Sequence, residues 1–173
     1  MNADTERHDL LFNTRRSVRY HMRREAFYDA WHKATSAVAV ISGSAAVGAL
    51  LSDLNNHLAI YAAAAVAVFS AIDLVVGTAA KARLHNDLRR RFLVLEQKLV
   101  TQEDALDRLG AEYLVIEADE PPVLRALDTI CYNDLLQAQG YSSDDDLYVP
   151  IRWYQRLTSQ VFNWPVTTLA RRS

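Results

Sequence analysis

Two apolar stretches, residues 34–51 and 58–80, stand six residues apart in the middle of this chain, and their connector contains no Lys or Arg. As helices rising about 1.5 Å per residue, the stretches would be roughly 27 Å and 35 Å long, which brackets the ~30 Å hydrocarbon core of a bilayer. The first stretch contains no charged residue, and the second contains one, Asp73. The pattern therefore predicts a transmembrane helical hairpin with spans of about 34–51 and 58–80.

A soluble bundle that buries an Ala-rich hairpin is the alternative, because the first stretch consists largely of Ala, Gly, Ser and Thr. The flanking charges favour the membrane. Under the positive-inside rule, basic residues outside both spans and none between them place both termini in the cytoplasm. These flanking residues include Arg15, Arg16, Arg19, Arg23, Arg24 and Lys33 before the hairpin, and Lys81, Arg83, Arg89, Arg90 and Arg91 after it.

Composition narrows the class further. Fifty per cent apolar and 23 per cent charged residues exclude general disorder, and a net charge of −2 gives no reason to expect nucleic acid as a partner. The single cysteine, Cys131, has no internal disulfide partner, which fits a reducing cytoplasmic side. The first 33 residues are polar and show no cleavable signal peptide, so we expect the hairpin itself to direct insertion.

Helical periodicity extends beyond the spans. Residues 9–33 lack Gly and Pro and carry apolar residues at helical intervals, so the first span should continue an amphipathic helix. After the second span, a 4,3,4 spacing with Gln102 at one core position predicts a heptad-like helix with the apolar residues Leu88, Phe92, Leu95, Leu99, Leu106 and Leu109. Its partner is either the helix 9–33, packed antiparallel, or a neighbouring subunit.

The C-terminal part should hold one more long helix. Glu117-Ala-Asp-Glu-Pro-Pro predicts a helix start, with acids at the positive end of the helix dipole, and Gly140 predicts its end. Residues 142–146 form an acidic loop, and the aromatic segment 151–162 either lies on the membrane surface or caps the bundle. The predicted fold is all-α: an amphipathic helix (1–33), the hairpin (34–80), cytoplasmic helices (81–140) and the C-terminal segment (141–173), assembled as an oligomer.

Catalytic signatures are absent from the sequence. His8, His21, His32, His57 and His85 are dispersed, and we expect most of them to be solvated or interfacial. The sequence contains no zinc-binding spacing, no phosphate-binding glycine loop and no nucleophile elbow. The acids Glu117, Asp119 and Glu120 could bind a cation, although a helix N-terminus explains them more simply. We therefore expect no enzyme activity, no cofactor and no metal.

Two features of the spans suggest function. Asp73 is an ionisable group in a predicted span, which is costly in lipid, so it should face a pore or another subunit. Alternatively, its role is structural: it forms a hydrogen bond with a Ser or Thr of the first span, or it lies near the membrane boundary. Ser44 and Gly48 have the small-xxx-small spacing that permits close helix approach, with Gly43 beside them. These four residues are the candidates for a pore or an oligomer contact.

The order of these segments resembles the SLATT proteins, two-transmembrane effectors associated with nucleotide-signalling immune systems of bacteria. The resemblance covers roughly residues 10–140 and rests on short patterns in this architecture: Arg15-Arg16-Ser-Val-Arg19-Tyr20-His21, Arg23-Arg24-Glu-Ala-Phe27-Tyr28, Ile41-Ser-Gly43-Ser44, Glu117-Ala-Asp-Glu120-Pro121-Pro122 and Cys131-Tyr132-Asn133. It implies oligomerisation in the inner membrane, then pore formation or membrane disruption that arrests or kills an infected cell. Unlike the multidomain members of the family, this chain is expected to carry no sensor or nucleotide-generating domain.

Two classes of function follow from these observations. The first is a homo-oligomeric effector that permeabilises the bacterial inner membrane in anti-phage defence, with itself and the lipid bilayer as partners and a cytoplasmic sensor protein or signalling ligand as trigger. The second is a non-conducting scaffold that recruits a cytoplasmic partner, or a prophage-encoded membrane protein with another role.

Overall fold

A computed structural model describes residues 3–51, 56–101, 105–143 and 145–166. The described residues form helices and no strand, which confirms the all-α class. The helices are α1 (Ala3–Leu51), α2 (Asn56–Val76), α3 (Thr78–Thr101), α4 (Leu106–Ala118), α5 (Arg125–Ala138) and α6 (Trp153–Thr158). The chain divides into two compact units: unit 1 comprises residues 1–24 and 85–173, and unit 2 comprises residues 25–84.

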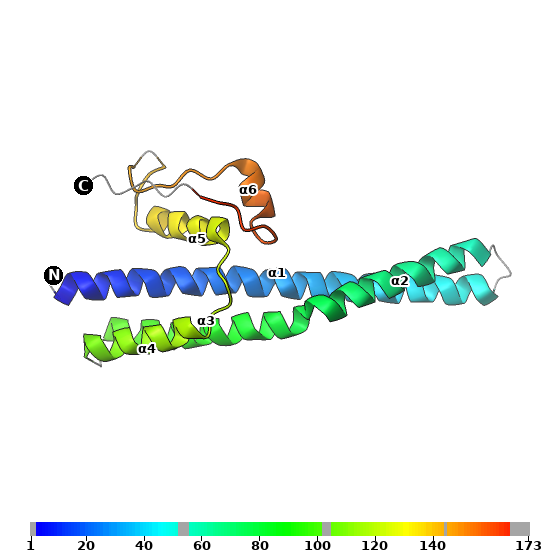
Figure 1. The fold of residues 1–173 in the computed structure, drawn as a ribbon, viewed down its shortest axis with the longest axis horizontal. Coiled ribbons are helices and arrows are strands. Elements are labelled where there is room, and N and C mark those ends of the chain that lie inside the picture. Colours follow the sequence, from blue (N-terminus) through cyan, green and yellow to red (C-terminus); the bar gives the residue numbers. More distant parts are fainter. Residues whose placement is uncertain (1–2, 52–55, 102–104, 144, 167–173) are drawn as a thin grey trace. The chain divides into compact units, whose positions relative to one another are not determined.

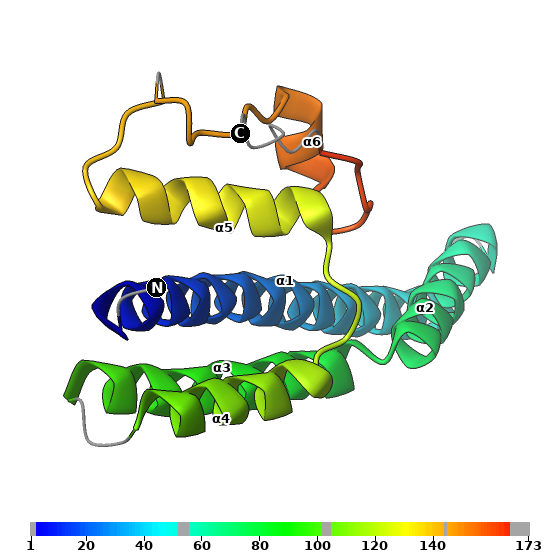
Figure 2. The ribbon, with the colours of Figure 1, turned by 60° about the vertical axis from the view of Figure 1, so that its left-hand side comes forward.

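Unit 1 is a helical bundle organised around the first half of α1. In Figures 1 and 2, this half lies between α5 on one side and the pair α3 and α4 on the other. The larger core cluster joins α3 to α4 and is covered by Leu10, Leu11 and Val18 of α1. Its fully buried members are Leu88, Phe92, Leu95, Leu99, Leu109 and Ile116. A second cluster joins α1 to α5 through Tyr20, Leu127 and Cys131.

The partner of the heptad-like helix is α1, packed antiparallel within the chain. Arg7 donates to the carbonyl of Leu99, Arg15 pairs with Glu96, and His21 contacts His85, so residue numbers fall on α3 as they rise on α1. The predicted core positions from Leu88 to Leu99 are buried as expected. One of the two partners predicted for this helix is therefore present, and it is the intrachain one.

The heptad-like pattern does not, however, form one helix. α3 ends at Thr101, Ala105 has an extended backbone, and Leu109 reaches the same core from α4. Gln102, predicted to fill a core position, lies outside the described residues. The apolar spacing survives the break because α4 folds back and packs against α3.

The predicted helix start at the two prolines is also wrong. α4 ends at Ala118 with Asp119 as its C-cap, and α5 begins only at Arg125. A proline disfavours helical backbone in the residue before it, so Pro121 and Pro122 hold a non-helical linker. The end of α5 was predicted correctly: Gly140, with φ of +93°, follows the last helical residue by two positions.

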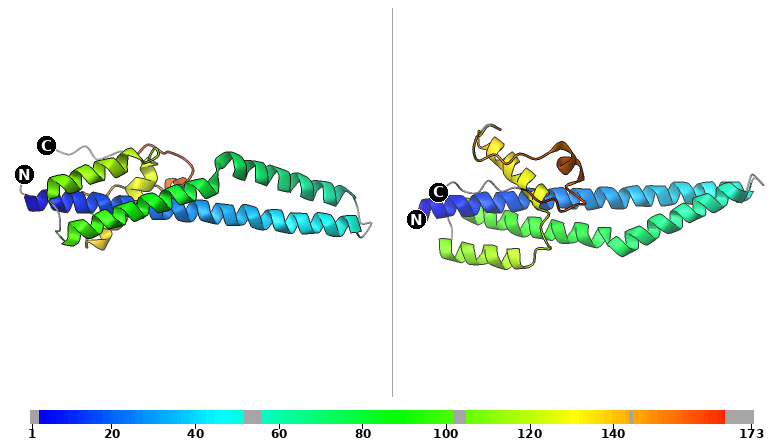
Figure 3. Two further views of the ribbon diagram at one scale, coloured as in Figure 1. Left: turned by 90° about the horizontal axis from the view of Figure 1, so that it is seen from below. Right: turned by 45° about the horizontal axis from the view of Figure 1, so that its top comes forward.

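Unit 2 contains the second half of α1, all of α2 and the first residues of α3. In Figures 1 and 3, α2 runs back along α1. Residues 52–55 of the predicted connector lie outside the described part of the chain. α2 ends before the predicted limit at Ala80, because Gly77 adopts φ of +63° and separates it from α3. Figure 3 shows the change of chain direction there.

One stretch of the described chain, within Ala63–Thr101, is long and apolar enough to cross a membrane, and 6% of its eighteen-residue apolar window is buried. The first predicted span is helical throughout, but the described residues give no second stretch that meets the same standard. The side chains of residues 45–47 and 49–51 in that span lie outside the described part of the chain. Among the described residues, one membrane-compatible helix is therefore found where two were predicted.

Candidate functional site

A polar cluster surrounds the break between α2 and α3 in unit 2. Thr78, the first residue of α3, donates its hydroxyl to one carboxylate oxygen of Asp73. The other carboxylate oxygen lies 3.2 Å from Nδ1 of His32 on α1. Gly77 makes this geometry possible, because only its left-handed backbone lets α3 restart directly after α2. Asp73 thus lies three residues before the end of α2 and links three helical segments.

The glycines of the first predicted span have open space where a side chain would begin. A methyl group added at Gly43 or at Gly48 would meet no described atom within 4 Å. The hydroxyl of Ser44 donates to the carbonyl of Val40 in its own helix. The small-xxx-small spacing therefore brings no other described helix of this chain close.

A buried histidine pair occupies the core of unit 1. Nδ1 of His21 on α1 lies 2.8 Å from Nδ1 of His85 on α3, and Nε2 of His21 lies 2.9 Å from a carboxylate oxygen of Glu120. Phe92 stacks on His21 with ring centroids 5.7 Å apart, and Tyr20 packs edge-on against both imidazoles. His21 is 0% exposed and His85 is 2% exposed. This cluster joins α1, α3 and the α4–α5 linker.

The protonation of this pair is constrained by its geometry. A hydrogen bond between two ring nitrogens needs one N–H donor and one bare acceptor, so the gap between the Nδ1 atoms holds one proton. Protonation of both rings would place two N–H groups 2.8 Å apart. His21 and His85 are buried, so they are exceptions to the prediction that most of the histidines are solvated or interfacial. The predicted antiparallel pairing of residues 9–33 with the helix after the second span could have suggested that His21 and His85 meet. It would have done so only with the correct register between the two helices.

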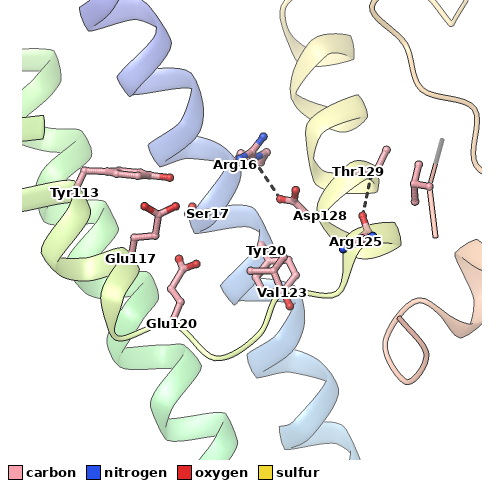
Figure 4. Close-up of a pocket in the computed structure, with 11 residues that line it drawn as sticks. Arg16, Ser17, Tyr20, Tyr113, Glu117, Glu120, Val123, Arg125, Asp128 and Thr129 are labelled. Carbon is pink, nitrogen blue, oxygen red and sulfur yellow. Dashed lines mark hydrogen bonds and ion pairs between the residues drawn. The ribbon is translucent and has the colours of Figure 1, made fainter. Parts of the chain in front are cut away.

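A cavity of about 460 Å³ lies beside this cluster, between α1, α4 and α5 (Figure 4). On one wall, Nε of Arg16 lies 3.2 Å from a carboxylate oxygen of Asp128. Burial raises the pKa of Asp128, and the nearby Arg16 offsets only part of that rise. Burial likewise raises the pKa of the Tyr113 phenol. The lining residues are Arg16, Ser17, Tyr20, Tyr113, Glu117, Glu120, Val123, Arg125, Asp128, Thr129 and Val166.

The three acids that could have bound a cation have different contacts. Asp119 accepts from Arg91, Glu120 contacts His21, and Glu117 and Glu120 both line the cavity. Across the described ranges, no cluster of three or more His, Cys, Asp or Glu side chains has the geometry of a metal site. Their explanation as the start of the next helix fails as well, because α5 begins at Arg125.

Several basic residues predicted to orient the hairpin have structural partners in unit 1. Arg15 pairs with Glu96 at 2.7 Å, Arg23 pairs with Asp134, and Arg24 donates to the carbonyl of Gln160 at 2.6 Å. In unit 2, Lys33 pairs with Asp29, and the Lys81 ammonium lies 5.6 Å from the centre of the Tyr28 ring. Arg19 and Arg89 are partly buried, whereas Arg83 and Arg90 are exposed.

Comparison with protein-family models, with curated proteins and with solved structures gives no match for this chain. The functional argument therefore rests on the residues and contacts described above.

Proposed function

We propose that this protein is a homo-oligomer of the bacterial inner membrane that forms a pore or disrupts the bilayer, acting as an effector in anti-phage defence. The observation that carries the proposal is the exposure of α2. Leu74 and Val75 are 84% and 85% exposed, and Ile60 and Tyr61 near the other end are 61% and 72% exposed. An apolar helix left uncovered by its own chain is stable in lipid and costly in water.

The second half of α1 completes the proposed hairpin. It is helical over the whole predicted span and lies beside α2, and the basic residues on either side of the hairpin support a cytoplasmic location of both chain ends. In this arrangement Asp73 lies near the cytoplasmic end of α2. Its contacts with Thr78 and His32 satisfy the carboxylate at the membrane boundary, and they leave it close to the mouth of a pore.

Self-association is supported by apolar surface that remains after unit 1 has folded. Leu93 and Val94 on α3 are 43% and 51% exposed, and Leu114 and Val115 on α4 are both 61% exposed. Leu93 and Val94 lie between the predicted heptad-like core positions, and Leu114 and Val115 follow the last of them, Leu109. A second copy of the chain would cover these four side chains, and the open surface at Gly43 would let spans of neighbouring copies approach.

The test is reconstitution of the full chain. Purified protein in mild detergent should form a higher oligomer, and liposomes that contain it should release a trapped dye. Val94→Ser with Val115→Ser should lower the oligomer number and the leakage together, whereas Leu147→Ser, at a residue that is 50% exposed elsewhere, should change neither. A monomer that inserts without leakage would contradict the proposal and favour the non-conducting scaffold.

A further inference from the structure

The chain after the acidic loop carries positive charge only. From Leu147 to Ser173 there is no Asp or Glu, and there are four arginines, Arg152, Arg156, Arg171 and Arg172. The first two lie in the described segment and are exposed. The same stretch contains two of the three tryptophans of the protein. Arginine with tryptophan is the composition of segments that lie at an anionic membrane surface.

Four large apolar side chains of this segment point away from the rest of unit 1. Trp153 and Leu157 of α6 are 78% and 76% exposed, and Val161 and Phe162 are 61% and 56% exposed. The turn continues past α6, because the amides of Val161 and Phe162 both donate to the carbonyl of Thr158. Residues four positions apart share one side of such a backbone, so Trp153, Leu157 and Val161 form one apolar ridge.

The other side of the segment is fastened to the bundle. Arg24 of α1 donates to the carbonyl of Gln160, and Asn163 accepts from the backbone amide of Arg125 on α5. The indole of Trp164 donates to Thr158 and packs edge-on against Tyr154. These contacts determine which side of the segment faces the bundle, and the ridge lies on the opposite, exposed side.

We propose that the ridge of Trp153, Leu157 and Val161, with Phe162 beside it and Arg152 and Arg156 flanking it, docks on the anionic lipid surface of the membrane that α2 crosses. This inference rests on the membrane location in the proposed function. The apolar side chains enter the interfacial layer, where tryptophan is favoured, and the guanidinium groups bind lipid phosphates.

A lipid surface fits this ridge better than a protein partner does. The segment that carries the ridge is positively charged and therefore complements anionic headgroups. The segment is also tethered near a bilayer: Arg24, which holds Gln160, precedes the start of the first predicted span at Ala34 by ten residues. Ten residues reach at most about 35 Å even when fully extended, so Arg24 stays within this distance of the predicted span. The ridge is therefore held close to the lipid surface, which raises its effective concentration there.

The experiment uses the full chain with a single environment-sensitive fluorophore, read by quenching from nitroxide-labelled lipids. Leu157→Cys places the label on the ridge, Gln137→Cys places it on an exposed polar position of α5, and Val68→Cys places it in α2. Cys131 is buried and should not compete for the label in the folded protein. Each labelled protein is reconstituted in phosphatidylcholine vesicles with or without phosphatidylglycerol.

We expect the label at 157 to be quenched strongly in the anionic vesicles and the label at 137 to be quenched weakly. Arg152→Gln with Arg156→Gln should lower the ratio of docked to undocked ridge by about thirtyfold, from the contribution of two cations near an anionic surface. High salt should also lower this ratio, because it screens the attraction between the arginines and the anionic lipids.

Three results would overturn the inference. Equal quenching at 157 and 137, with strong quenching at 68, would show a protein that crosses the membrane without docking the ridge. Quenching at 157 that ignores lipid charge and both arginines would remove the anionic surface as the ligand. A label at 157 that becomes shielded without lipid quenching would assign the ridge to a second protein copy. Absence of quenching at 68 would instead overturn the proposed membrane function itself.

Discussion

Replacing His85 with Leu should destabilise unit 1 by about 2 kcal/mol, because it leaves Nδ1 of His21 buried without its partner. Leu fills a similar volume, so the cost arises from the orphaned polar atom and not from a cavity. The imidazole of His21 is 0% exposed and stacked on Phe92, so water cannot easily replace His85. For a chain of this length, the expected fall in Tm is roughly 4–8 °C.

A double-mutant cycle separates this effect from general damage to the core. His21→Leu removes the ring nitrogen that contacts Nδ1 of His85, whereas His21→Leu with His85→Leu removes both ring nitrogens of this contact and also the contact with Glu120. The side chain of Glu120 is 12% exposed and can turn toward water. The double variant should therefore be more stable than the sum of the single variants predicts, by about 1–2 kcal/mol.

The assay is thermal unfolding of the purified full chain in detergent, followed by circular dichroism. His8→Leu is the matched control, since His8 is exposed, and it should change stability by less than about 0.5 kcal/mol. Additive effects of the two single variants would refute the paired geometry.

Four further perturbations test other parts of the structure. Gly77→Ala should destabilise the break between α2 and α3 by about 1–2 kcal/mol, because alanine resists a φ of +63°, and Gly77→Asn should lower the Tm less, since asparagine tolerates that region. Asp128→Asn should stabilise the protein at pH 7: burial raises the pKa of Asp128 in the folded state, so its ionisation costs stability as pH rises through that pKa, and the gain should vanish in acid below the pKa of an unfolded aspartate. Thermal melts at the two pH values check this sign, and equal effects at both would contradict it. Cys131, whose thiol pKa burial raises to about 12, should react with maleimide at pH 7 far more slowly in the folded protein than in denaturant. Phe92→Ala should cost about 3–5 kcal/mol in denaturant unfolding, as expected for a fully buried ring.

The buried face of α3 could be predicted because it depends on local spacing, whereas the choice of α1 over a neighbouring subunit as its partner could not. Leu88, Phe92, Leu95 and Leu99 recur at helical intervals on one face, and all four are buried. The break after Thr101 could not be predicted from the same pattern, since Leu109 occupies a heptad-compatible position whether its helix continues or folds back. Apolar periodicity identifies the buried face, but it does not determine how many helices supply that face.

The buried histidines were missed for a related reason. His21 and His85 are 64 residues apart, and they meet only in one antiparallel register of α1 and α3. A shift of one helical turn, about 5.4 Å, would separate the two rings. The acids beside the prolines were misread because a helix N-terminus offered a local explanation, whereas Glu120 is held by a contact with α1. Local rules predict ordinary helix ends better than contacts between distant segments.

The placement of basic residues was the main argument from the sequence for a membrane location, and the structure weakens that argument. Arg15, Arg16 and Arg23 each pair with an acid of α3 or α5, so a folded bundle has its own use for them. An excess of arginine before the hairpin is therefore compatible with either location. The exposed side chains of α2 are different, because water does not favour apolar side chains as exposed as Leu74 and Val75. The case for the membrane thus rests first on an uncovered apolar helix, and the arginines indicate its orientation only once that helix is placed in lipid.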